Sequence, residues 1–266
     1  MAEGIPKVIV IGPAFIDMAI KCDEHPTPEK VAEGSGFTLL PSGRGVNQAI
    51  QVAMCGCDTS FMARIGEDCF GKVICQTLER YRIHTDLVYP TNAMSTGIVV
   101  TVVNSKGENF SCRSIGANRI LGRDEVECAA AEQHIGSSDA MLIEDCVPQQ
   151  AAVAAIRSAQ VHKVRVVFSA KLSQPSREVV NSLDWPMEYY NADILVLRFK
   201  GLMCASELGA GGEGDLKLIG TELVAHGAKC VVISLGWRGA LVIDRQGSRH
   251  LPGIPLEVVD QNGCDS

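Results

Sequence analysis

A glycine-rich stretch at residues 41–49 (PSGRGVNQA) has the residue types of a ligand-binding turn that opens a helix. Gly43 and Gly45 permit close backbone approach and positive φ angles. The apolar residues that follow predict an amphipathic helix that ends near Gly56. The start of such a helix offers free N–H groups and a positive dipole end to a polyhydroxyl or anionic ligand. The same spacing also fits an ordinary tight turn before a helix, so residue types alone leave both interpretations open.

The charge and cysteine content narrow the class of protein. The formal net charge of −7 and the pI of about 5.4 argue against a nucleic-acid-binding protein that relies on a basic face. The eleven cysteines are an odd number without a recognisable spacing, and we find no export signal. We therefore expect reduced thiols and a cytoplasmic protein. Cys55 and Cys57 form a C-x-C pair, but nothing near them completes a zinc site.

The apolar run at residues 8–12 breaks at Pro13, which makes it too short for a signal-peptide core or a membrane span. We interpret it as a buried first strand and expect no membrane partner. Similar β-branched runs follow at residues 141–143, 164–168, 194–197 and 231–235. Segments with helical spacing, such as 71–81 and 216–226, lie between such runs. This alternation predicts an α/β fold with a doubly wound, mainly parallel sheet.

Two segments depart from the alternation of strands and helices. Residues 18–40 contain strand-like pieces around a Pro/Glu-rich turn, and residues 96–113 read as two strands around a turn at Asn104–Gly107. We expect these strands to form a small sheet of their own. Both faces of the strand at 98–103 are apolar, which favours a homodimer through this sheet. Glycines at 209, 211, 212 and 214 predict a flexible loop.

Together, several stretches resemble the ribokinase-like (PfkB-type) carbohydrate kinases. Residues 41–49 are similar to the family's first signature, commonly G-G-K-G-x-N-x-A, with Ser42 and Arg44 as departures. The other similar stretches follow in the family's order, and they are 23–37, 66–71, 96–98, 107–109, 116–118 and 234–240.

This resemblance implies a single three-layer α/β domain over residues 1–266, with lid segments at about 18–40 and 96–113. It also implies ATP-dependent phosphotransfer to a hydroxyl of a sugar or nucleoside, with ATP, Mg²⁺ and a monovalent cation as cofactors. Such a kinase binds a small molecule rather than nucleic acid or a membrane.

The resemblance assigns roles by position. The acceptor would be bound by Asp17, Gly43, Arg44, Asn47 and Glu144. The nucleotide would lie against Ser234, Gly236 and Gly239, and Asp260 would serve the metal. Asp265 would deprotonate the acceptor hydroxyl, with the amides of Gly263 and Cys264 forming an anion hole. An alignment on Pro148 would instead place Cys146 at the position of Glu144.

The C-terminal residues that would take part in phosphate transfer depart from the family pattern. The family reads roughly D-T-x-G-A-G-D, whereas this chain ends D-Q-N-G-C-D-S at residues 260–266. One glycine is missing, Asp265 comes one place early, and the chain stops where the family adds further elements. A small misplacement at an anion hole is costly. Cys264 could be taken for a nucleophile, but no histidine lies nearby in sequence to activate it.

Three further departures affect the candidate site. Residues 198–201 (RFKG) replace the N-x-x-E that organises magnesium and phosphate in the family. Phe15 stands where a ribokinase has asparagine, and residues 169–171 (SAK) replace an N-P-A-like turn. Trp237 could cover a nucleotide base, although we favour a packing role. Three hypotheses remain open: an active carbohydrate kinase, a homologue that binds a sugar or nucleoside without catalysis, and a truncated fragment of a kinase.

Overall fold

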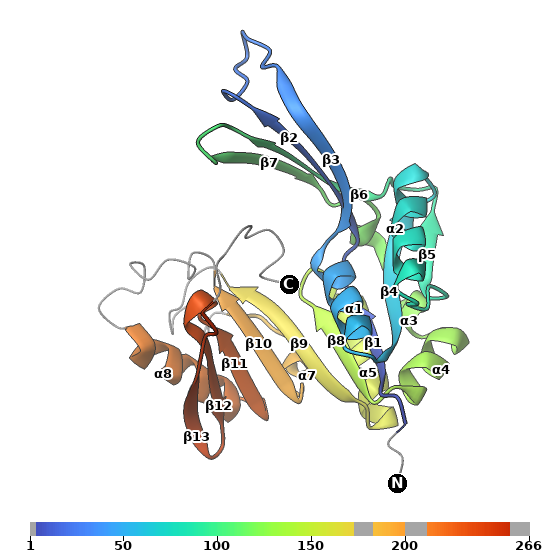
Figure 1. Cartoon of the computed structure of the whole chain (residues 1–266). Helices are drawn as coiled ribbons and strands as arrows, with labels where there is room; N and C mark the ends of the chain where they lie inside the picture. Colours follow the sequence, from blue (N-terminus) through green and yellow to red (C-terminus); the bar gives the residue numbers. More distant parts are fainter. Residues whose placement is uncertain (1–3, 173–182, 200–211, 256–266) are drawn as a thin grey trace. The chain divides into compact units, whose positions relative to one another are not determined.

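The computed structural model describes residues 4–172, 183–199 and 212–255. These residues form two compact units (Figure 1). Unit 1 contains residues 4–125 and 146–148, and unit 2 contains residues 126–145 together with the described residues from 149 to 255. Within the described ranges, no helix is both long and apolar enough to cross a membrane.

Unit 1 combines a parallel sheet with a separate four-stranded sheet. Strands β1, β4 and β5 form the parallel sheet, in the order β1-β4-β5. Helix α1 contacts β1 and β4, and α2 contacts β4. The elements of this unit are β1 (Lys7–Ile11), β2 (Phe15–Cys22), β3 (Gly34–Ser42), α1 (Arg44–Met54), β4 (Asp58–Gly66), α2 (Cys69–Arg80), β5 (Val88–Thr91), β6 (Gly97–Val103), β7 (Asn109–Ser114) and the 3-10 helix η1 (Gly116–Ile120), followed by α3 (Arg123–Val126).

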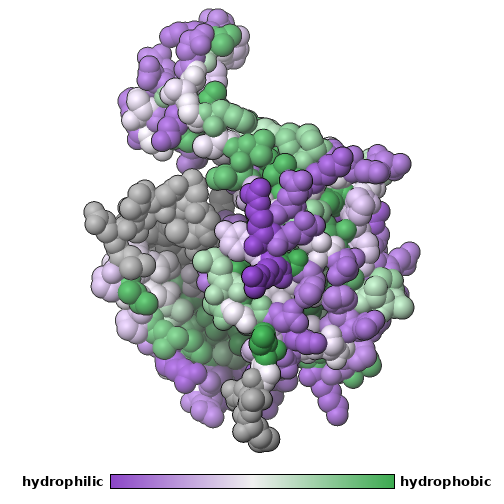
Figure 2. Space-filling model, turned by 45° about the vertical axis from the view of Figure 1, so that its right-hand side comes forward, coloured by the Kyte–Doolittle hydropathy of each residue, from purple (hydrophilic) through white to green (hydrophobic). Residues whose placement is uncertain are grey.

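The small sheet has the order β3-β2-β6-β7, with a parallel pair β2–β6 between two antiparallel edge strands. These are the strands predicted from segments 18–40 and 96–113. The turn at Asn104–Gly107 is held by Asn104, whose Oδ1 accepts bonds from the N–H groups of Lys106 and Glu108. Gly107 adopts φ 79°, which suits a glycine. Figure 2 shows hydrophobic residues at the base of this sheet and more polar ones over its far end.

Unit 2 contains six strands in the order β8-β9-β10-β11-β12-β13, of which β8 to β11 are parallel and β12 and β13 form an antiparallel hairpin. Helix α5 contacts β9, and α8 contacts β11 and β12. The elements are α4 (Ala129–Ser137), β8 (Ala140–Glu144), α5 (Gln149–His162), β9 (Arg165–Leu172), α7 (Met187–Tyr190), β10 (Ile194–Phe199), α8 (Gly212–Ala225), β11 (Cys230–Ser234), the 3-10 helix η2 (Gly236–Arg238), β12 (Gly239–Asp244) and β13 (Gly247–Pro252).

The α/β fold class, the largely parallel sheet and the separate small sheet are confirmed. The predicted flexible loop is wrong for Gly212 and Gly214, because both lie in the first turn of α8. Apolar residues three to four apart, Leu216, Ile219 and Leu223, are fully buried in the core of unit 2. Their burial stabilises the helix beyond what glycine in its first turn costs. Gly209 and Gly211 lie outside the described residues.

Asp68 fastens the start of α2 to the start of β6. Its Oδ1 accepts a bond from Gly71 N–H at 2.8 Å and one from the Thr96 hydroxyl at 2.7 Å, and its Oδ2 accepts a bond from Thr96 N–H at 2.8 Å. Burial alone would raise the pKa of this carboxyl, but these bonds to the charged form outweigh it and lower the pKa below 3.8. Asp68 therefore caps the helix as a carboxylate.

We expect Asp68→Ala to lower the free energy of unfolding by about 1–2 kcal/mol at neutral pH, because the cap and the bonds to Thr96 are lost. The folded-state pKa is depressed, so the stabilisation is present above the unfolded pKa and disappears as pH falls through the folded pKa. Urea unfolding of both proteins at pH 7 and at pH 3 measures this difference. If the difference in free energy of unfolding between the two proteins stays constant down to pH 3, the charge of Asp68 has no such role.

Candidate functional site

The glycine-rich stretch forms a tightly packed helix start in unit 1. Gly43 precedes α1 with φ 98°, and a Cβ atom there would lie 2.7 Å from the carbonyl oxygen of Pro13. A Cβ atom on Gly45 would lie 2.6 Å from the carbonyl carbon of Gly12. Both glycines are therefore required by conformation or by contact. The result is that the N-terminus of α1 lies directly against the turn between β1 and β2.

Asn118 fastens the same turn from the other side. This side chain is 4% exposed. Its Oδ1 accepts a bond from Ala14 N–H at 2.7 Å, and its Nδ2 donates to the carbonyl oxygens of Ala14 at 2.8 Å and Ile115 at 2.9 Å. The exit of the small sheet and the β1–β2 turn are therefore joined by one buried amide. In the sequence, Asn118 lies in the family-like stretch 116–118, and no local signal indicates its role.

Asp17 lies on one face of the small sheet with Phe15 and Arg113. Strand pairing places Asp17 beside Val99, and Val99 beside Arg113. Residues paired in this way point to the same side of the sheet. The Arg113 guanidinium lies 5.9 Å from the centre of the Phe15 ring, within the range of a cation–π contact. This face therefore presents a carboxylate and a cation near the start of β2, above the nearly buried ring of Phe15.

Arg44 and Asn47 lie in the first turn of α1, and both side chains are half-buried. The Asn47 N–H donates to the carbonyl oxygen of Gly43 at 2.9 Å. Unit 1 thus brings Gly43, Arg44 and Asn47 together at one helix start. Ser42 pairs with Phe15, so this helix start immediately follows the strand that borders β2. The packing around Gly43 and Asn118 holds these elements in register.

In unit 2, Glu144 and Arg198 form a buried ion pair. Arg198 Nη2 lies 2.9 Å from Glu144 Oε2, and their side chains are 11% and 0% exposed. Glu144 ends β8, Arg198 is near the end of β10, and β9 lies between them. The predicted acceptor ligand Glu144 is therefore engaged inside the protein by the arginine that replaces the family's asparagine. Sequence reasoning noted Arg198 only as a departure and missed its partner.

The turn after β11 carries the residues predicted to contact the nucleotide. Ser234 pairs with Ala240, and the Leu235 N–H donates to the Gly239 carbonyl oxygen at 2.8 Å. Gly239 has φ 99°, and a Cβ atom there would lie 2.0 Å from the carbonyl oxygen of Leu251. Gly236 also has a positive φ, of 60°. No larger residue could replace Gly239 in this narrow turn without distortion, and the positive φ of Gly236 also favours glycine.

Trp237 lies at the tip of this turn and is 68% exposed. The packing role that we favoured for it is therefore wrong in the described structure. The remaining predicted residues, Asp260, Gly263, Cys264 and Asp265, lie outside the described residues.

Comparison of the sequence with protein-family models shows the family of this chain. Residues 5–265 match the model of the pfkB family carbohydrate kinases. The chain belongs to this family. The match includes the glycine-rich stretch at 41–49 as well as the C-terminal stretch at 260–265.

Individual members of the family are distant relatives. Mouse ribokinase is 24% identical over 98% of this chain and 79% of the mouse protein. The deoxyribokinase of Salmonella typhi is 22% identical, over 97% of this chain and 81% of that protein. The structure of Arabidopsis thaliana ribokinase in complex with ribose and ATP superposes with a TM-score of 0.82 at 22% identity, covering 98% of this chain and 83% of that one. This structural likeness shows the fold.

The described residues of this family member do not fit a protein-bound magnesium site. Mg²⁺ takes oxygen ligands in octahedral geometry, usually from carboxylates and phosphates. Within the described ranges, no group of three or more His, Cys, Asp or Glu side chains could hold a metal ion. Glu144 faces a guanidinium instead. Asp260 lies outside the described residues and stays a predicted metal ligand.

Proposed function

We propose that this protein transfers the γ-phosphoryl group of ATP to a hydroxyl of a sugar or nucleoside. One observation carries the proposal: the match to the carbohydrate kinases spans residues 5–265 and so includes both signature stretches. Ribokinase and deoxyribokinase among its relatives favour a pentose as the acceptor. The complex of the Arabidopsis relative favours ATP as the donor.

In this proposal, the acceptor is held at the base of the small sheet in unit 1. Asp17 accepts hydrogen bonds from sugar hydroxyls, and the start of α1 supplies Arg44, Asn47 and the backbone at Gly43. Phe15, which is 6% exposed, packs beneath this face beside Asp17. The Asp265 carboxylate removes the proton of the attacking hydroxyl, and the amides of Gly263 and Cys264 stabilise the negative charge of the transferred phosphoryl group.

The turn with Ser234, Gly236 and Gly239 contacts the nucleotide. Mg²⁺ and a monovalent cation remain predicted cofactors, and we propose cytoplasmic activity.

A catalytically inactive, sugar-binding role is the second candidate. The Glu144–Arg198 pair favours this inactive role, because Arg198 binds the carboxylate of Glu144, which the family resemblance assigns to ligand binding. Such a protein would keep the acceptor face of unit 1 without turnover.

ADP release by the purified protein, with ATP, magnesium and a panel of pentoses and nucleosides, tests the kinase proposal. Asp265→Asn and Asp17→Asn are run beside it. We expect turnover with at least one acceptor, its loss with Asp265→Asn, and an acceptor affinity that Asp265→Asn leaves nearly intact. Asp17→Asn should instead weaken acceptor binding. Absence of turnover, with an acceptor that still raises the melting temperature, would favour the inactive binder.

We further propose a homodimer through the apolar face of the small sheet. Strand pairing places one set of side chains on the face opposite Asp17, and most of its members are apolar. They are Ile16, Met18, Ile20, Leu39, Pro41, Ile98, Val100, Val102, Phe110 and Cys112. Phe110 is 73% exposed and Val100 is 39% exposed. An apolar sheet face of this kind favours a protein partner, and a second copy is self-complementary.

Val100→Lys is expected to shift this protein toward the monomer, because it places a charge on the apolar face. Thr101→Lys adds the same charge to the opposite face and should leave the oligomeric state unchanged. Sedimentation velocity at several concentrations distinguishes the two variants. A wild-type protein that stays monomeric at all concentrations would exclude the dimer.

A further inference from the structure

Unit 2 has a polar cavity of about 540 Å³ at the amino ends of β9, β10 and β11, which we call the amino-end cavity. Three loops that each follow a helix and precede a strand meet there. The connection from α5 to β9 contributes Lys163 and Arg165, and the connection from α7 to β10 contributes Asn191 and Asp193. The connection from α8 to β11 contributes Lys229, and Gln160 comes from the end of α5. Cavities of roughly 300–1,000 Å³ are typical of small-molecule sites.

The lining of the amino-end cavity is positively charged. It contains three cations, Lys163, Arg165 and Lys229, and one carboxylate, Asp193. Both carboxylate oxygens of Asp193 are engaged, Oδ1 by Lys229 Nζ at 2.6 Å and Oδ2 by the Val166 N–H at 2.8 Å. Within the described ranges, Lys163 and Arg165 form no salt bridge, although Arg165 lies near enough to Asp193 to contribute to lowering the pKa of that carboxyl. The charge excess stands out in a chain whose net charge is −7.

The cations at this cavity are not needed to cap the neighbouring helices. At the end of α5, Val164 N–H donates to the Ala159 carbonyl oxygen at 2.8 Å, and Lys163 N–H donates to that of Gln160 at 3.2 Å. At the end of α8, Ala228 N–H donates to the Leu223 oxygen at 3.2 Å. These are the bonds by which a helix satisfies its own last carbonyl groups. Lys229 is engaged by Asp193, so the side chains of Lys163 and Arg165 are the cations available to a ligand.

Lys163 occupies a backbone conformation that normally selects glycine. Its φ is 60°, at the position where α8 has Gly227. A left-handed conformation is less favourable for an L-residue than for glycine. Arg82 has the same conformation, with φ 59°, after α2 in unit 1. The backbone alone therefore marks no site at Lys163, but it provides a matched pair of positions for an experiment.

We propose that the amino-end cavity binds a small phosphorylated metabolite through its phosphomonoester group. The phosphate carries a charge of about −1.5 to −2 at neutral pH and would be held by Lys163 and Arg165. Asn191 and Gln160 can bond to the hydroxyls of the same ligand. The cavity volume fits a small molecule, and the overall negative charge of the chain disfavours an extended polyanion.

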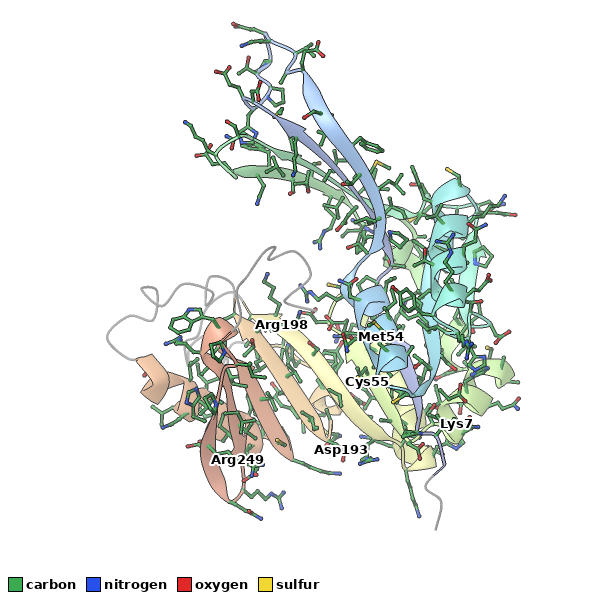
Figure 3. All side chains as sticks on the ribbon, in the orientation of Figure 1. Lys7, Met54, Cys55, Asp193, Arg198 and Arg249 are labelled. Atoms are coloured by element: carbon green, nitrogen blue, oxygen red, sulfur yellow. The ribbon has the colours of Figure 1, made fainter. Side chains whose placement is uncertain are left out.

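This cavity is separate from the proposed nucleotide residues. Figure 3 shows Asp193 and Arg198 at opposite ends of β10. A strand of this length separates its two ends by about 17 Å. The turn after β11 lies at the carboxyl end of its strand, whereas Lys229 precedes that strand. Binding in the amino-end cavity therefore does not depend on the kinase proposal.

Isothermal titration calorimetry with ribose 5-phosphate at low ionic strength tests the proposal on the whole chain. Lys163→Gly removes one cation and also relieves the left-handed backbone. We expect it to weaken binding by about fivefold while the melting temperature stays equal or rises. Lys163→Gly/Arg165→Gln should weaken binding by about 20-fold or more.

Arg82→Gly is the matched control, because it removes the same charge from the same backbone conformation in the other unit. It should leave the affinity for ribose 5-phosphate unchanged. Inorganic phosphate should compete with ribose 5-phosphate, and ribose should not. Equal affinity in the wild type, in Lys163→Gly and in the double variant would overturn the proposal. Absence of any binding to the wild type at millimolar concentrations would also overturn it.

Discussion

Replacing Arg198 with methionine is expected to lower the free energy of unfolding by about 3–5 kcal/mol, because it leaves a charged partner inside the protein. Glu144 is fully buried, and the guanidinium of Arg198 lies 2.9 Å from its Oε2. A buried carboxylate that loses its guanidinium partner loses the counter-charge that offset its lost hydration. Urea unfolding at neutral pH measures the loss.

The double variant Glu144→Gln/Arg198→Met identifies the cause. It carries neither charge, so it should regain a large part of the stability that Arg198→Met loses. Arg157→Met is the matched control, since Arg157 pairs with Glu188 at 2.7 Å while its own side chain is 62% exposed. That exposed pair should contribute about 1 kcal/mol or less. A loss below about 1 kcal/mol for Arg198→Met would show that the buried pair does not stabilise the fold.

Replacing Asn118 with leucine is expected to cost about 2–4 kcal/mol of stability and to weaken acceptor binding. Leucine has a similar volume but can make none of the three hydrogen bonds of the buried amide. The N–H of Ala14 and the carbonyl groups of Ala14 and Ile115 would then lie in the interior without this partner. Because the β1–β2 turn leads directly to Asp17, its distortion should also displace that carboxylate.

Two measurements separate these effects. Urea unfolding gives the stability, and calorimetric titration with the best acceptor, at a temperature where the variant is folded, gives the affinity. We expect the acceptor Kd to rise at least tenfold. Asn92→Leu serves as the control, because Asn92 is an exposed residue of the same unit and should change stability by about 0.5 kcal/mol or less. An Asn118→Leu variant with unchanged acceptor affinity would show that the amide does not position Asp17.

The results on Arg198 and on ADP release bear on each other. If turnover is observed, the Glu144–Arg198 pair is compatible with phosphotransfer, and a double variant without this pair should alter the kinetics. If no turnover is observed while acceptors bind, the pair is one of the departures from the family pattern, together with residues 260–266, that accompany the loss of catalysis.

The sequence determined the main elements of the fold because their signals are local. Short β-branched runs predicted β1, β8, β9, β10 and β11, and the alternation with helical spacing predicted the parallel sheet. The strands outside this alternation predicted the small sheet. The antiparallel hairpin of β12 and β13 was not predicted, because β13 is exposed along its whole length and carries no apolar alternation, although Leu241, Val242 and Ile243 of β12 are buried.

Glycine-rich segments show where local signals failed. Gly43 precedes a helix as expected and Gly45 lies in its first turn, but the reason for both glycines lies in distant residues, since Pro13 and Gly12 leave no room for a Cβ atom. Gly212 and Gly214 suggested a loop, yet they open α8, because the burial of Leu216, Ile219 and Leu223 favours a helix. Glycine permits many conformations, and contacts with other segments select among them.

The sequence by itself determined the family, the order of the elements and the candidate acceptor residues at 17 and 43–47. Only the tertiary structure decided which charges meet. It paired Glu144 with Arg198 across β9, joined Asn118 to a turn 104 residues earlier, and gathered Lys163, Arg165 and Lys229 around one cavity. The physical reason is that helices and strands follow from the spacing of hydrophobic residues that are close in sequence. The role of a charge or an amide depends instead on partners that folding brings within hydrogen-bond distance.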